Sequence, residues 1–262
     1  MKVKCDDWKI YDVEDKDIKY LHRLMCGDST NIQDIEKLMN GKKFNLIHTD
    51  PPYWIKYEWG SKKRKIMDND DISVYPFYYD VFTNVALHTE KWAGIYVWHA
   101  SSETHNVINA LLDSGWLFKS YIVWNKNNST FWKSDYHWKH EPAFYWWLDG
   151  WPQNRNWDRK QTTVREIKKP SKSEEHPTMK PIELCEKAIN NSSKIWDIVW
   201  DLFWWSWSTL IASEKTNRKC YMMELDKIYC EVILKRYYQF TKWQKEIKCL
   251  NREIDLTSIL EW

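Results

Sequence analysis

Short apolar runs alternate with amphipathic stretches along most of the chain. Five runs have the length and composition of buried strands, at 44–50, 94–100, 120–126, 197–203 and 219–226. Between and after them, apolar positions recur at helical spacing, which predicts helices at 31–39, 77–88, 103–114, 182–192, 208–216 and 227–242. Strands that alternate with helices are typical of parallel βαβ construction. We therefore predict one α/β domain with a Rossmann-like, doubly wound and mostly parallel sheet.

The alternation breaks down between about 127 and 175. This segment is polar, aromatic and basic, and it has no clear period. A long irregular insertion in a compact α/β domain is usually functional. We therefore divide the domain into an N-terminal part (1–126), an irregular insertion (127–175) and a C-terminal part (176–262).

Composition and charge narrow the class of protein. The 39 basic and 37 acidic residues of this 262-residue chain nearly cancel, so net charge argues neither for nor against nucleic acid. The six cysteines form no metal-ligand pattern, and a disulfide framework is not expected in a chain of this length without a secretory signal. No apolar run is long enough to cross a membrane. We expect a soluble cytoplasmic protein with no bound metal and no membrane partner.

The tetrapeptide Asp50-Pro51-Pro52-Tyr53 closes the first predicted strand. In an open parallel sheet, ligands bind beyond the carboxyl ends of the strands, so chemistry is expected here. The two prolines fix the backbone and remove two N–H donors, which leaves carbonyls to accept hydrogen bonds. A carboxylate and a carbonyl beside an aromatic ring suit the exocyclic amino group of a stacked base. A strand that simply ends in a proline-rich turn is the alternative.

A second stretch, DLFWWSWST at 201–209, joins a predicted strand to a predicted helix. Such a corner usually contains glycine, because the chain turns sharply and lies close to a ligand. Here tryptophan occupies three of the positions 204–208. The chain holds 20 Trp and only 6 Gly, whereas an average content of roughly 7% would give about 18 glycines.

Together with HPTMKP at 176–181, these two stretches resemble the motifs of DNA methyltransferases that use S-adenosylmethionine to methylate the exocyclic amino group of a base. The order, with DPPY first, a target-recognition segment in the middle and the cofactor loop late, is similar to the permuted β class. Further blocks, LMCGDST, YHWKHEP, DRKQTTV and STLIASEKTNRKCY, also read like that family, so the resemblance extends from about 24 to 240. It implies a methyltransferase sheet, S-adenosylmethionine as cofactor and double-stranded DNA as partner. It is compatible with a homodimer and with a partner restriction enzyme.

The resemblance gives the DPPY residues their roles. Asp50 and the carbonyl of Pro51, followed by Pro52, would accept hydrogen bonds from the target amino group, whose nitrogen attacks the sulfonium methyl. Tyr53 would stack on a base extruded from the duplex. A direct displacement of this kind needs no metal, so positioning and electrostatics supply most of the acceleration. The Asp favours adenine N6, because cytosine-N4 members more often carry Ser there. Cytosine N4, an inactive DNA-binding relative, and an enzyme that acts on RNA or protein through related motifs remain alternatives.

The cofactor residues are also implied by the resemblance. Glu224, at the end of the last predicted strand, would bind ribose hydroxyls, and Asp28 would lie near the adenine, although a Gly-Asp turn is common. His176, Thr178 and Lys180 would lie against the methionine part, or would equally serve as residues at the start of a helix. The cofactor loop contributes Asp201, Phe203, Trp205, Ser206, Trp207, Ser208 and Thr209.

Contacts with DNA are expected from two basic regions. The run SKKRK at 61–65 follows the DPPY motif closely enough to meet a phosphate backbone, although such a run is also typical of a solvated face. In the insertion, Trp138 is compatible with a place in the core. The candidates for DNA recognition there are Lys133, Tyr136, His137, Lys139, Arg155, Arg159 and Lys160.

Tryptophan repeatedly occupies positions where the family has glycine. These positions are Trp54, Trp59, Trp132, Trp146, Trp196, Trp204, Trp205 and Trp207. By contrast, Trp98, Trp124 and Trp138 lie where the family tolerates tryptophan. Some bacteria read the codon UGA as glycine and others read it as tryptophan. We hypothesise that the first group of positions is encoded by UGA and is glycine in the natural protein. A genuine aromatic cluster in a relative that has lost its cofactor is the alternative.

Overall fold

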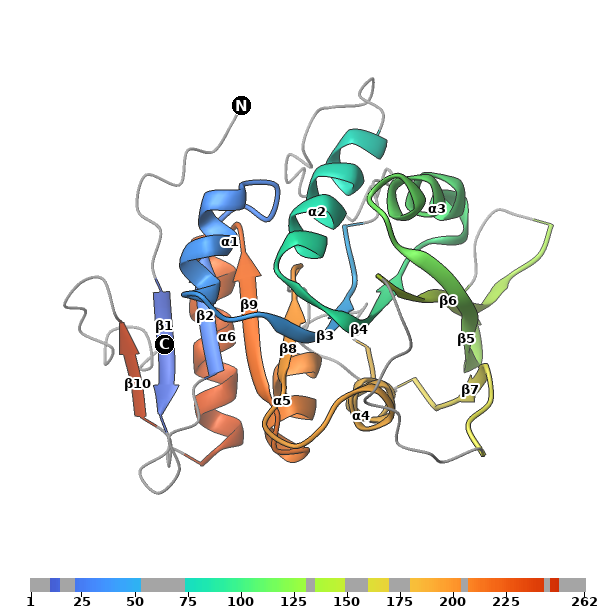
Figure 1. The fold of residues 1–262 in the computed structure, drawn as a ribbon. Coiled ribbons are helices and arrows are strands. Elements are labelled where there is room, and N and C mark those ends of the chain that lie inside the picture. The colour runs from blue at the N-terminus through green and yellow to red at the C-terminus, as the bar shows by residue number, and fades with distance from the viewer. Residues whose placement is uncertain are drawn as a thin grey trace, which may run out of the picture.

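The computed structural model of the chain describes residues 10–14, 22–52, 74–130, 135–148, 160–169, 180–203, 207–242 and 246–249 (Figure 1). The strands are β1 (Ile10–Glu14), β2 (His22–Cys26), β3 (Phe44–Thr49), β4 (Thr89–Trp98), β5 (Leu117–Thr130), β6 (Trp138–Trp147), β7 (Val164–Glu166), β8 (Ile198–Asp201), β9 (Lys219–Glu224) and β10 (Glu246–Cys249). The helices are α1 (Ile32–Met39), α2 (Tyr75–Leu87), the 3-10 turn η1 (Ser101–Glu103), α3 (Thr104–Asp113), α4 (Ile182–Ser192), α5 (Ser208–Lys215) and α6 (Lys227–Phe240).

The strands form one sheet in the order β10-β1-β2-β9-β8-β3-β4-β6-β5-β7. The central run from β2 to β4 is parallel throughout. Antiparallel pairs lie on both sides of it: β1 pairs with β2 and β10, and β6 pairs with β4 and β5. This arrangement confirms the predicted Rossmann-like α/β fold with a mostly parallel sheet.

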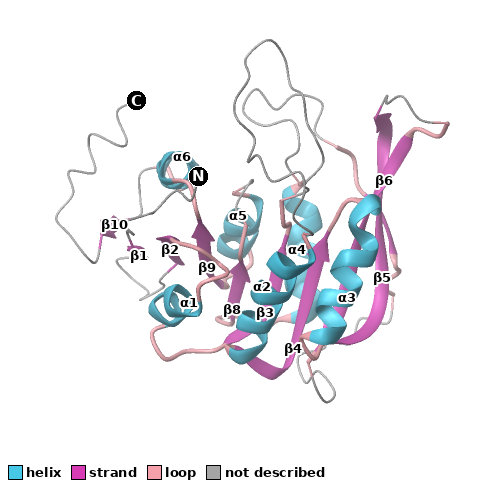
Figure 2. Cartoon of the chain, turned by 90° about the horizontal axis from the view of Figure 1, so that it is seen from above, coloured by secondary structure: helices cyan, strands magenta, loops and turns pink. Residues whose placement is uncertain are grey.

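Helices cover both faces of the sheet, with α1, α2 and α3 on one side and α4, α5 and α6 on the other (Figure 2). Because successive strand side chains point to opposite faces, neighbouring residues enter different cores. In β8, Trp200 packs with the residues beneath α1–α3, whereas Val199 packs beneath α4. A strand buried on both faces reads as a continuous apolar run, which is why the central strands could be predicted.

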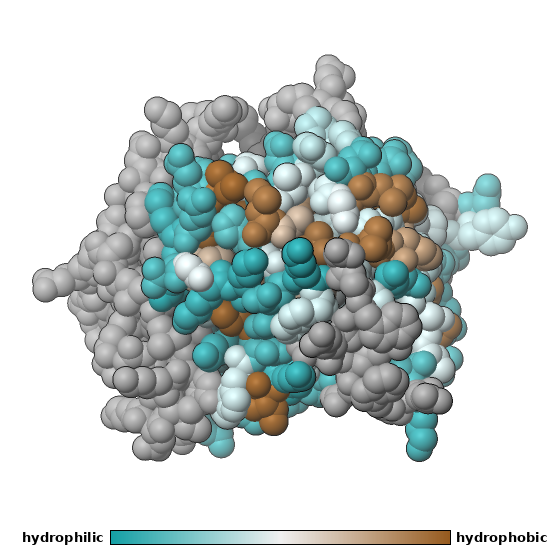
Figure 3. All heavy atoms as spheres, in the orientation of Figure 1, coloured by the Kyte–Doolittle hydropathy of each residue, from teal (hydrophilic) through white to brown (hydrophobic). Residues whose placement is uncertain are grey.

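The surface of the molecule is mixed in character on the side that faces the viewer in Figure 1. On the face drawn in Figure 3, hydrophobic and hydrophilic residues are interspersed.

Side-chain caps fix where two of the helices begin. The Asn31 side chain accepts from the Gln33 amide at the start of α1, and the Asp226 side chain accepts from the Ile228 amide at the start of α6. No helix in the described ranges is long and apolar enough to cross a membrane.

Part of the segment 127–175 is regular, which differs from the expectation. Strand β6 lies inside the sheet, between β4 and β5, and its Phe144 and Trp146 are buried. Strand β7 forms the edge beyond β5. β6 could not be predicted from the sequence, because Glu141 and Pro142 interrupt its apolar pattern. Its position in the sheet also depends on long-range pairing with β4. Strands β1, β2 and β10 were also not predicted.

Candidate active site

The carboxyl ends of the parallel strands bring four predicted site residues to one edge of the sheet. Asp50 follows β3, Asp201 ends β8, Glu224 ends β9, and Asp28 follows β2. The chain runs from β3 to one side through α2 and from β8 to the other side through α5. The order of connection therefore reverses between β8 and β3. Ligands of doubly wound sheets bind at such a switch point, and Asp50 and Asp201 lie on its two strands.

The DPPY turn is anchored from α2. The hydroxyl of Tyr78 donates to the carbonyl oxygen of Pro52 at 3.3 Å. Burial, aided by the charges of Glu103 and Asp50, raises the pKa of Tyr78, so the hydroxyl keeps the proton that it donates. No motif in the sequence indicates this contact. Tyr53 lies outside the described residues.

Lys180 reaches the DPPY motif from the start of α4. Its Nζ lies 2.6 Å from Oδ2 of Asp50 and 3.0 Å from Oε2 of Glu141. The same Nζ lies 5.7 Å from the centre of the Trp98 ring, within reach of a cation–π contact. The Lys180 side chain is only 4% exposed. A residue expected at the cofactor therefore also contacts the expected catalytic carboxylate.

Glu141 is a member of this cluster that was not among the predicted site residues. It lies on β6 and forms ion pairs with both Lys180 and Lys126. Burial alone would raise the pKa of Glu141, but the charges of Lys180 and Lys126 lower it to about 2. Glu141 is therefore ionised. The block YHWKHEP, which contains it, was the only signal in the sequence.

A second hydrogen-bonded chain supports Asp201. The indole N–H of Trp98 donates to Nε2 of His48 at 3.0 Å. Burial, with the charge of Lys180, lowers the pKa of His48 to about 3, so the ring is neutral. Since Nε2 accepts, we assign the ring proton to Nδ1, which then donates to Oγ1 of Thr209 at 3.2 Å. Thr209 in turn bonds to the side chain of Asp201.

Asp201 is a buried carboxyl group in an unusual state. Burial, with a smaller contribution from the charge of Asp50, raises its pKa to about 8, against hydrogen bonds from Thr209, Phe203 and Thr49 that favour the ionised form. Asp201 therefore holds a proton near neutral pH. A cationic ligand beside it would favour ionisation.

The start of the cofactor loop is hydrogen-bonded to the end of β3 and to the turn after β2. The amide of Leu202 donates to Oγ1 of Thr49 at 3.3 Å, and its carbonyl accepts from the Ser29 hydroxyl at 3.0 Å. The Phe203 ring lies 5.4 Å from that of Phe77 on α2. Trp205 and Ser206 lie outside the described residues.

Asp28 follows β2, and Glu224 ends the adjacent strand β9. The amide of Gly27 donates to the carbonyl of Glu224 at 3.0 Å. Oδ1 of Asp28 accepts from the amide and the hydroxyl of Thr30, at 2.9 and 2.7 Å. Oε1 of Glu224 accepts from the Asp226 amide at 2.9 Å. Both carboxylates are thus oriented by the turns that follow their strands.

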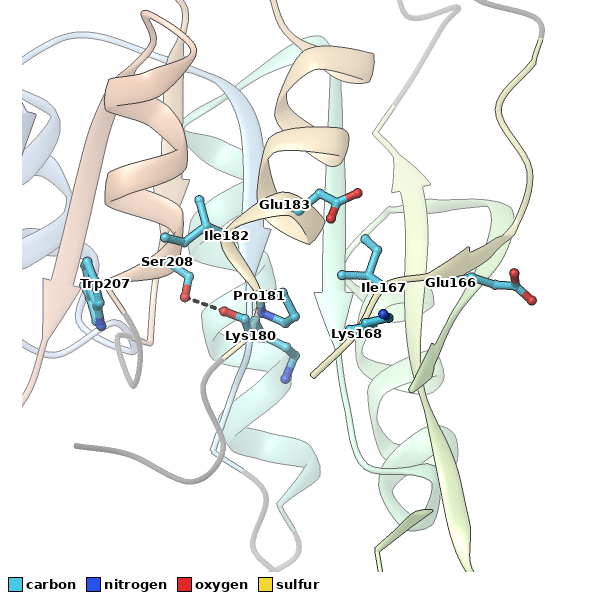
Figure 4. A pocket seen from close by; sticks show the side chains of 9 residues that line it. All are labelled: Glu166, Ile167, Lys168, Lys180, Pro181, Ile182, Glu183, Trp207 and Ser208. Carbon is cyan, nitrogen blue, oxygen red and sulfur yellow. Dashed lines mark hydrogen bonds between the residues drawn. The ribbon is translucent and has the colours of Figure 1, made fainter. Parts of the chain in front are cut away.

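A cavity of about 520 Å³ lies beside Lys180, between the starts of α4 and α5 and the segment after β7 (Figure 4). Ser208 Oγ donates to the carbonyl of Lys180 at 2.6 Å and ties the two helix starts together. Of the predicted cofactor residues, Lys180, Trp207 and Ser208 line this cavity. Asp28, Asp201 and Glu224 do not. His176 and Thr178 lie outside the described residues.

Three of the suspect tryptophans lie in described parts of the chain. Trp196 has φ 75°, a left-handed conformation that strongly favours glycine. Trp207 has φ −38°, so its backbone needs no glycine in this structure. Trp146 is buried, and its indole N–H has no hydrogen-bond acceptor among the described residues. That last feature does not by itself mark a glycine position, since Trp200, stacked on Phe44, shares it.

The other suspect positions, Trp54, Trp59, Trp132, Trp204 and Trp205, lie outside the described residues. At two of the positions where the family tolerates tryptophan, the indole N–H has a hydrogen-bond acceptor. Trp98 donates to His48, and Trp124 donates to the carbonyl of Ile167 at 2.7 Å.

Three of the predicted DNA-contacting residues, Tyr136, His137 and Lys139, lie at the tip of the β5–β6 ladder, which projects from the body of the molecule (Figures 1 and 2). Tyr136 is 88% exposed, and His137 and Lys139 are exposed beside it. Trp138 is 47% exposed, so its interpretation as a core residue is wrong. Lys160 is exposed as well. The run at 61–65, Lys133, Arg155 and Arg159 lie outside the described residues.

Comparisons with solved structures show the same fold. M1.HpyAVI in complex with S-adenosylmethionine superposes with a TM-score of 0.64 and 22% identity over 81% of this chain and 98% of that one. PvuII DNA methyltransferase, described as cytosine-N4-specific, superposes with a TM-score of 0.66 and 16% identity, over 91% of this chain and 89% of that one. TTHA0409, a putative DNA modification methylase from Thermus thermophilus complexed with S-adenosyl-L-methionine, superposes with a TM-score of 0.58 and 18% identity. The match covers 83% of this chain and 93% of that one. No curated protein matches the chain at the sequence level.

The site fits the chemistry of the cofactor of such enzymes. Carboxyl groups at neighbouring strand ends suit hydroxyl groups and a cationic centre, and the Lys180 ammonium beside the cavity suits a carboxylate. A family model described as DNA methylase matches residues 44–235, which include both switch-point carboxyl groups and the cavity. The chain therefore belongs to the DNA methylase family of N6/N4 amino-group methyltransferases, whose cofactor is S-adenosylmethionine.

Proposed function

We propose that the chain methylates the N6 amino group of adenine in double-stranded DNA. The observation that carries this proposal is Asp50, the first residue of DPPY, at the switch point of the sheet and within 2.6 Å of Lys180. A carboxylate in this position can accept a hydrogen bond from an exocyclic amino group. The carboxylate, in place of the serine more common in cytosine-N4 enzymes, favours adenine.

Asp50 and Pro51 would orient the target amino group. Lys180 holds one oxygen of the Asp50 carboxylate, and Tyr78 binds the carbonyl of Pro52 and so fixes the turn. Two acceptors held in this way would draw the amino hydrogens into one direction and present the nitrogen lone pair. Orientation of this kind is the main catalytic resource of a direct transfer. Tyr53 is proposed to stack on the extruded base.

The cofactor, when bound, supplies a methyl group activated by a sulfonium centre. We propose that Asp28 and Glu224 bind its adenosine part and that Lys180 and the loop residues Asp201–Thr209 bind its methionine part. The arrangement of Asp28 and Glu224 at the ends of adjacent strands, with Asp201 and Lys180 farther along the same edge, supports this direction of binding. The projecting tip with Tyr136 and Lys139 is proposed to contact DNA.

Methylation of plasmid DNA, read by sequencing that resolves the modified base and its context, tests the proposal. Methyl groups on adenine N6 support it, whereas methyl groups on cytosine N4 favour the alternative of the same family. If DNA is bound but no base is modified, even with glycine at the suspect positions, the chain is an inactive DNA-binding relative. A homodimer, a partner restriction enzyme and a cytoplasmic location stay predictions.

We also propose that glycine stands at the suspect tryptophan positions of the natural protein. The left-handed conformation of Trp196 supports this independently of the resemblance. The codons decide: UGA is expected at position 196 and at the other suspect positions, and UGG at positions 98, 124 and 138. UGG at the suspect positions would refute the proposal.

A further inference from the structure

The buried cluster beside the DPPY turn alternates in charge along its length. Lys126 pairs with Glu141, Glu141 pairs with Lys180, and Lys180 pairs with Asp50. The two lysine side chains are only 7% and 4% exposed. The cluster therefore connects the predicted catalytic carboxylate to a strand of the segment 127–175.

Lys180 is shared between two carboxylates. The Lys180 ammonium donates a hydrogen bond to Asp50 and forms an ion pair with Glu141, while it lies over the Trp98 ring. A role of Glu141 limited to neutralising Lys126 would require no contact between Glu141 and Lys180. Its two carboxylate oxygens nevertheless divide between the lysines, because Oε1 contacts Lys126 and Oε2 lies 3.0 Å from Nζ of Lys180.

Glu141 is paired with β5, just before the part of β6 that is paired on both sides. It is opposite Trp124 in the β5–β6 ladder, and two residues farther along β6, Ala143 pairs with Trp98 of β4. A side chain on a strand that is paired on both sides can set a neighbour's position closely. Lys180 and Asp50 both lie just outside regular elements, before α4 and after β3.

We propose that Glu141 is a positioning residue for methyl transfer: by sharing Lys180, it fixes the lysine against Asp50 and so sets the orientation of the Asp50 carboxylate. This inference rests on the proposed catalytic role of Asp50. Without Glu141, Lys180 would keep Asp50 as a partner but lose the second carboxylate that limits its movement. The expected loss is in kcat, because a misaligned carboxylate affects the reacting geometry more than it affects ground-state binding.

The test separates positioning from charge neutralisation. Glu141→Gln alone leaves Lys126 and Lys180 with one carboxylate between them, so this variant can fail through instability. The double variant Lys126→Met/Glu141→Gln removes one charge of each sign and leaves the Lys180–Asp50 pair. We expect it to melt near the temperature of the parent and to lose between about 10- and 100-fold in kcat, the scale of a small misplacement at the reacting centre. KM for DNA and for S-adenosylmethionine should change little.

A double variant that regains the kcat of the parent would overturn the inference, because Glu141 would then serve only to neutralise Lys126. If the double variant does not fold, Glu141→Asp replaces it: this change keeps the charge but withdraws the carboxylate from Lys180. A fall in kcat without a fall in melting temperature is expected, and full kcat would again overturn the inference.

Asp50→Ala, measured in the same assay, separates this inference from the proposed function. Inactive Asp50→Ala with fully active Glu141 variants would defeat the inference alone. Active Asp50→Ala would defeat the proposed role of Asp50 and the inference with it. All variants are made both with tryptophan and with glycine at the suspect positions. An absence of methyl transfer from both parents would overturn the proposed function and this inference together.

Discussion

Nζ of Lys180 lies 2.6 Å from Oδ2 of Asp50, although 130 residues separate the two in the chain. The contact joins the HPTMKP block to the DPPY block, which are far apart in the sequence. A lysine expected beside the cofactor thus also orients the carboxylate expected beside the base. The proposed places of the cofactor and of the target base therefore meet at the Lys180 side chain.

Replacement of Lys180 by Met should slow methyl transfer strongly. The loss of a buried cation beside a reacting carboxylate is expected to lower kcat by at least about 100-fold, the scale seen when one preorganised polar group is removed from an active site. Lys187→Met is the control, because this lysine is exposed on α4 and pairs along the helix surface with Glu183. Single-turnover measurements compare both variants with the parent. Equal losses in the two variants would contradict the assignment.

Trp196→Gly should stabilise the fold. A left-handed backbone costs a residue with a Cβ roughly 1–2 kcal/mol, and Trp196 is 42% exposed, so its indole is not part of the core. We expect the free energy of unfolding to rise by about 1 kcal/mol in urea titrations. Trp196→Ala is the matched control, since it removes the ring but keeps the Cβ. If Ala and Gly have the same effect, backbone strain is not the cause.

The stability of the chain should depend on the ionisation of Asp201. Its pKa is 3.8 when unperturbed and about 8 in the fold, chiefly through burial. The folded state therefore binds more protons than the unfolded state between these values. The corresponding stability is fully present below the lower value and is lost as pH rises through the upper one.

Denaturation at a series of pH values measures this effect. The free energy of unfolding should fall between about pH 4 and about pH 8, and Asp201→Asn should flatten this part of the curve. Glu141 does not contribute to the same window, because its pKa is lowered to about 2 and its stabilising effect is lost only in acid. An unchanged slope in Asp201→Asn would show that other groups cause the fall.

Glycine in the cofactor loop should restore cofactor binding. The Trp207 ring lines the cavity beside Lys180, and Trp204 and Trp205 belong to the same loop. In calorimetric titrations, the triple change to glycine is expected to raise the affinity for S-adenosylmethionine by at least about tenfold, or about 1.4 kcal/mol. Trp138→Gly, a change at an exposed position far from the loop in sequence, serves as the control. Equal affinities of the parent and the triple variant would refute the expectation.

The elements that the sequence predicted are those whose burial leaves a simple pattern. β3, β8 and β9 are covered on both faces, so their apolar runs are continuous. β6 also lies inside the sheet, but Glu141 and Pro142 fall within it, and no local rule indicates that a strand inside the sheet should carry a glutamate. Its position follows from pairing with β4 and β5, which the sequence does not reveal.

The site residues likewise fall into those that sequence motifs identified and those that only the fold brings to the site. Asp50, Lys180 and Ser208 could be chosen because each belongs to a motif with a fixed spacing. Their partners Glu141 and Tyr78 could not, because the contacts exist only after distant elements pack together. The chain of bonds from Trp98 through His48 and Thr209 is likewise a product of the fold. Motifs identified the participants, and tertiary packing set their states of protonation.

The continuity of β6 has a practical consequence for engineering sequence preference. One end of this strand is an exposed tip with Tyr136 and Lys139 beside it, and its middle carries Glu141, which contacts Lys180 in the interior. A graft that replaced the whole of 127–175 with the corresponding segment of a relative would therefore exchange part of the active centre as well. Chimaeras should keep the recipient's residues 141–147 and join the donor segment on either side of them.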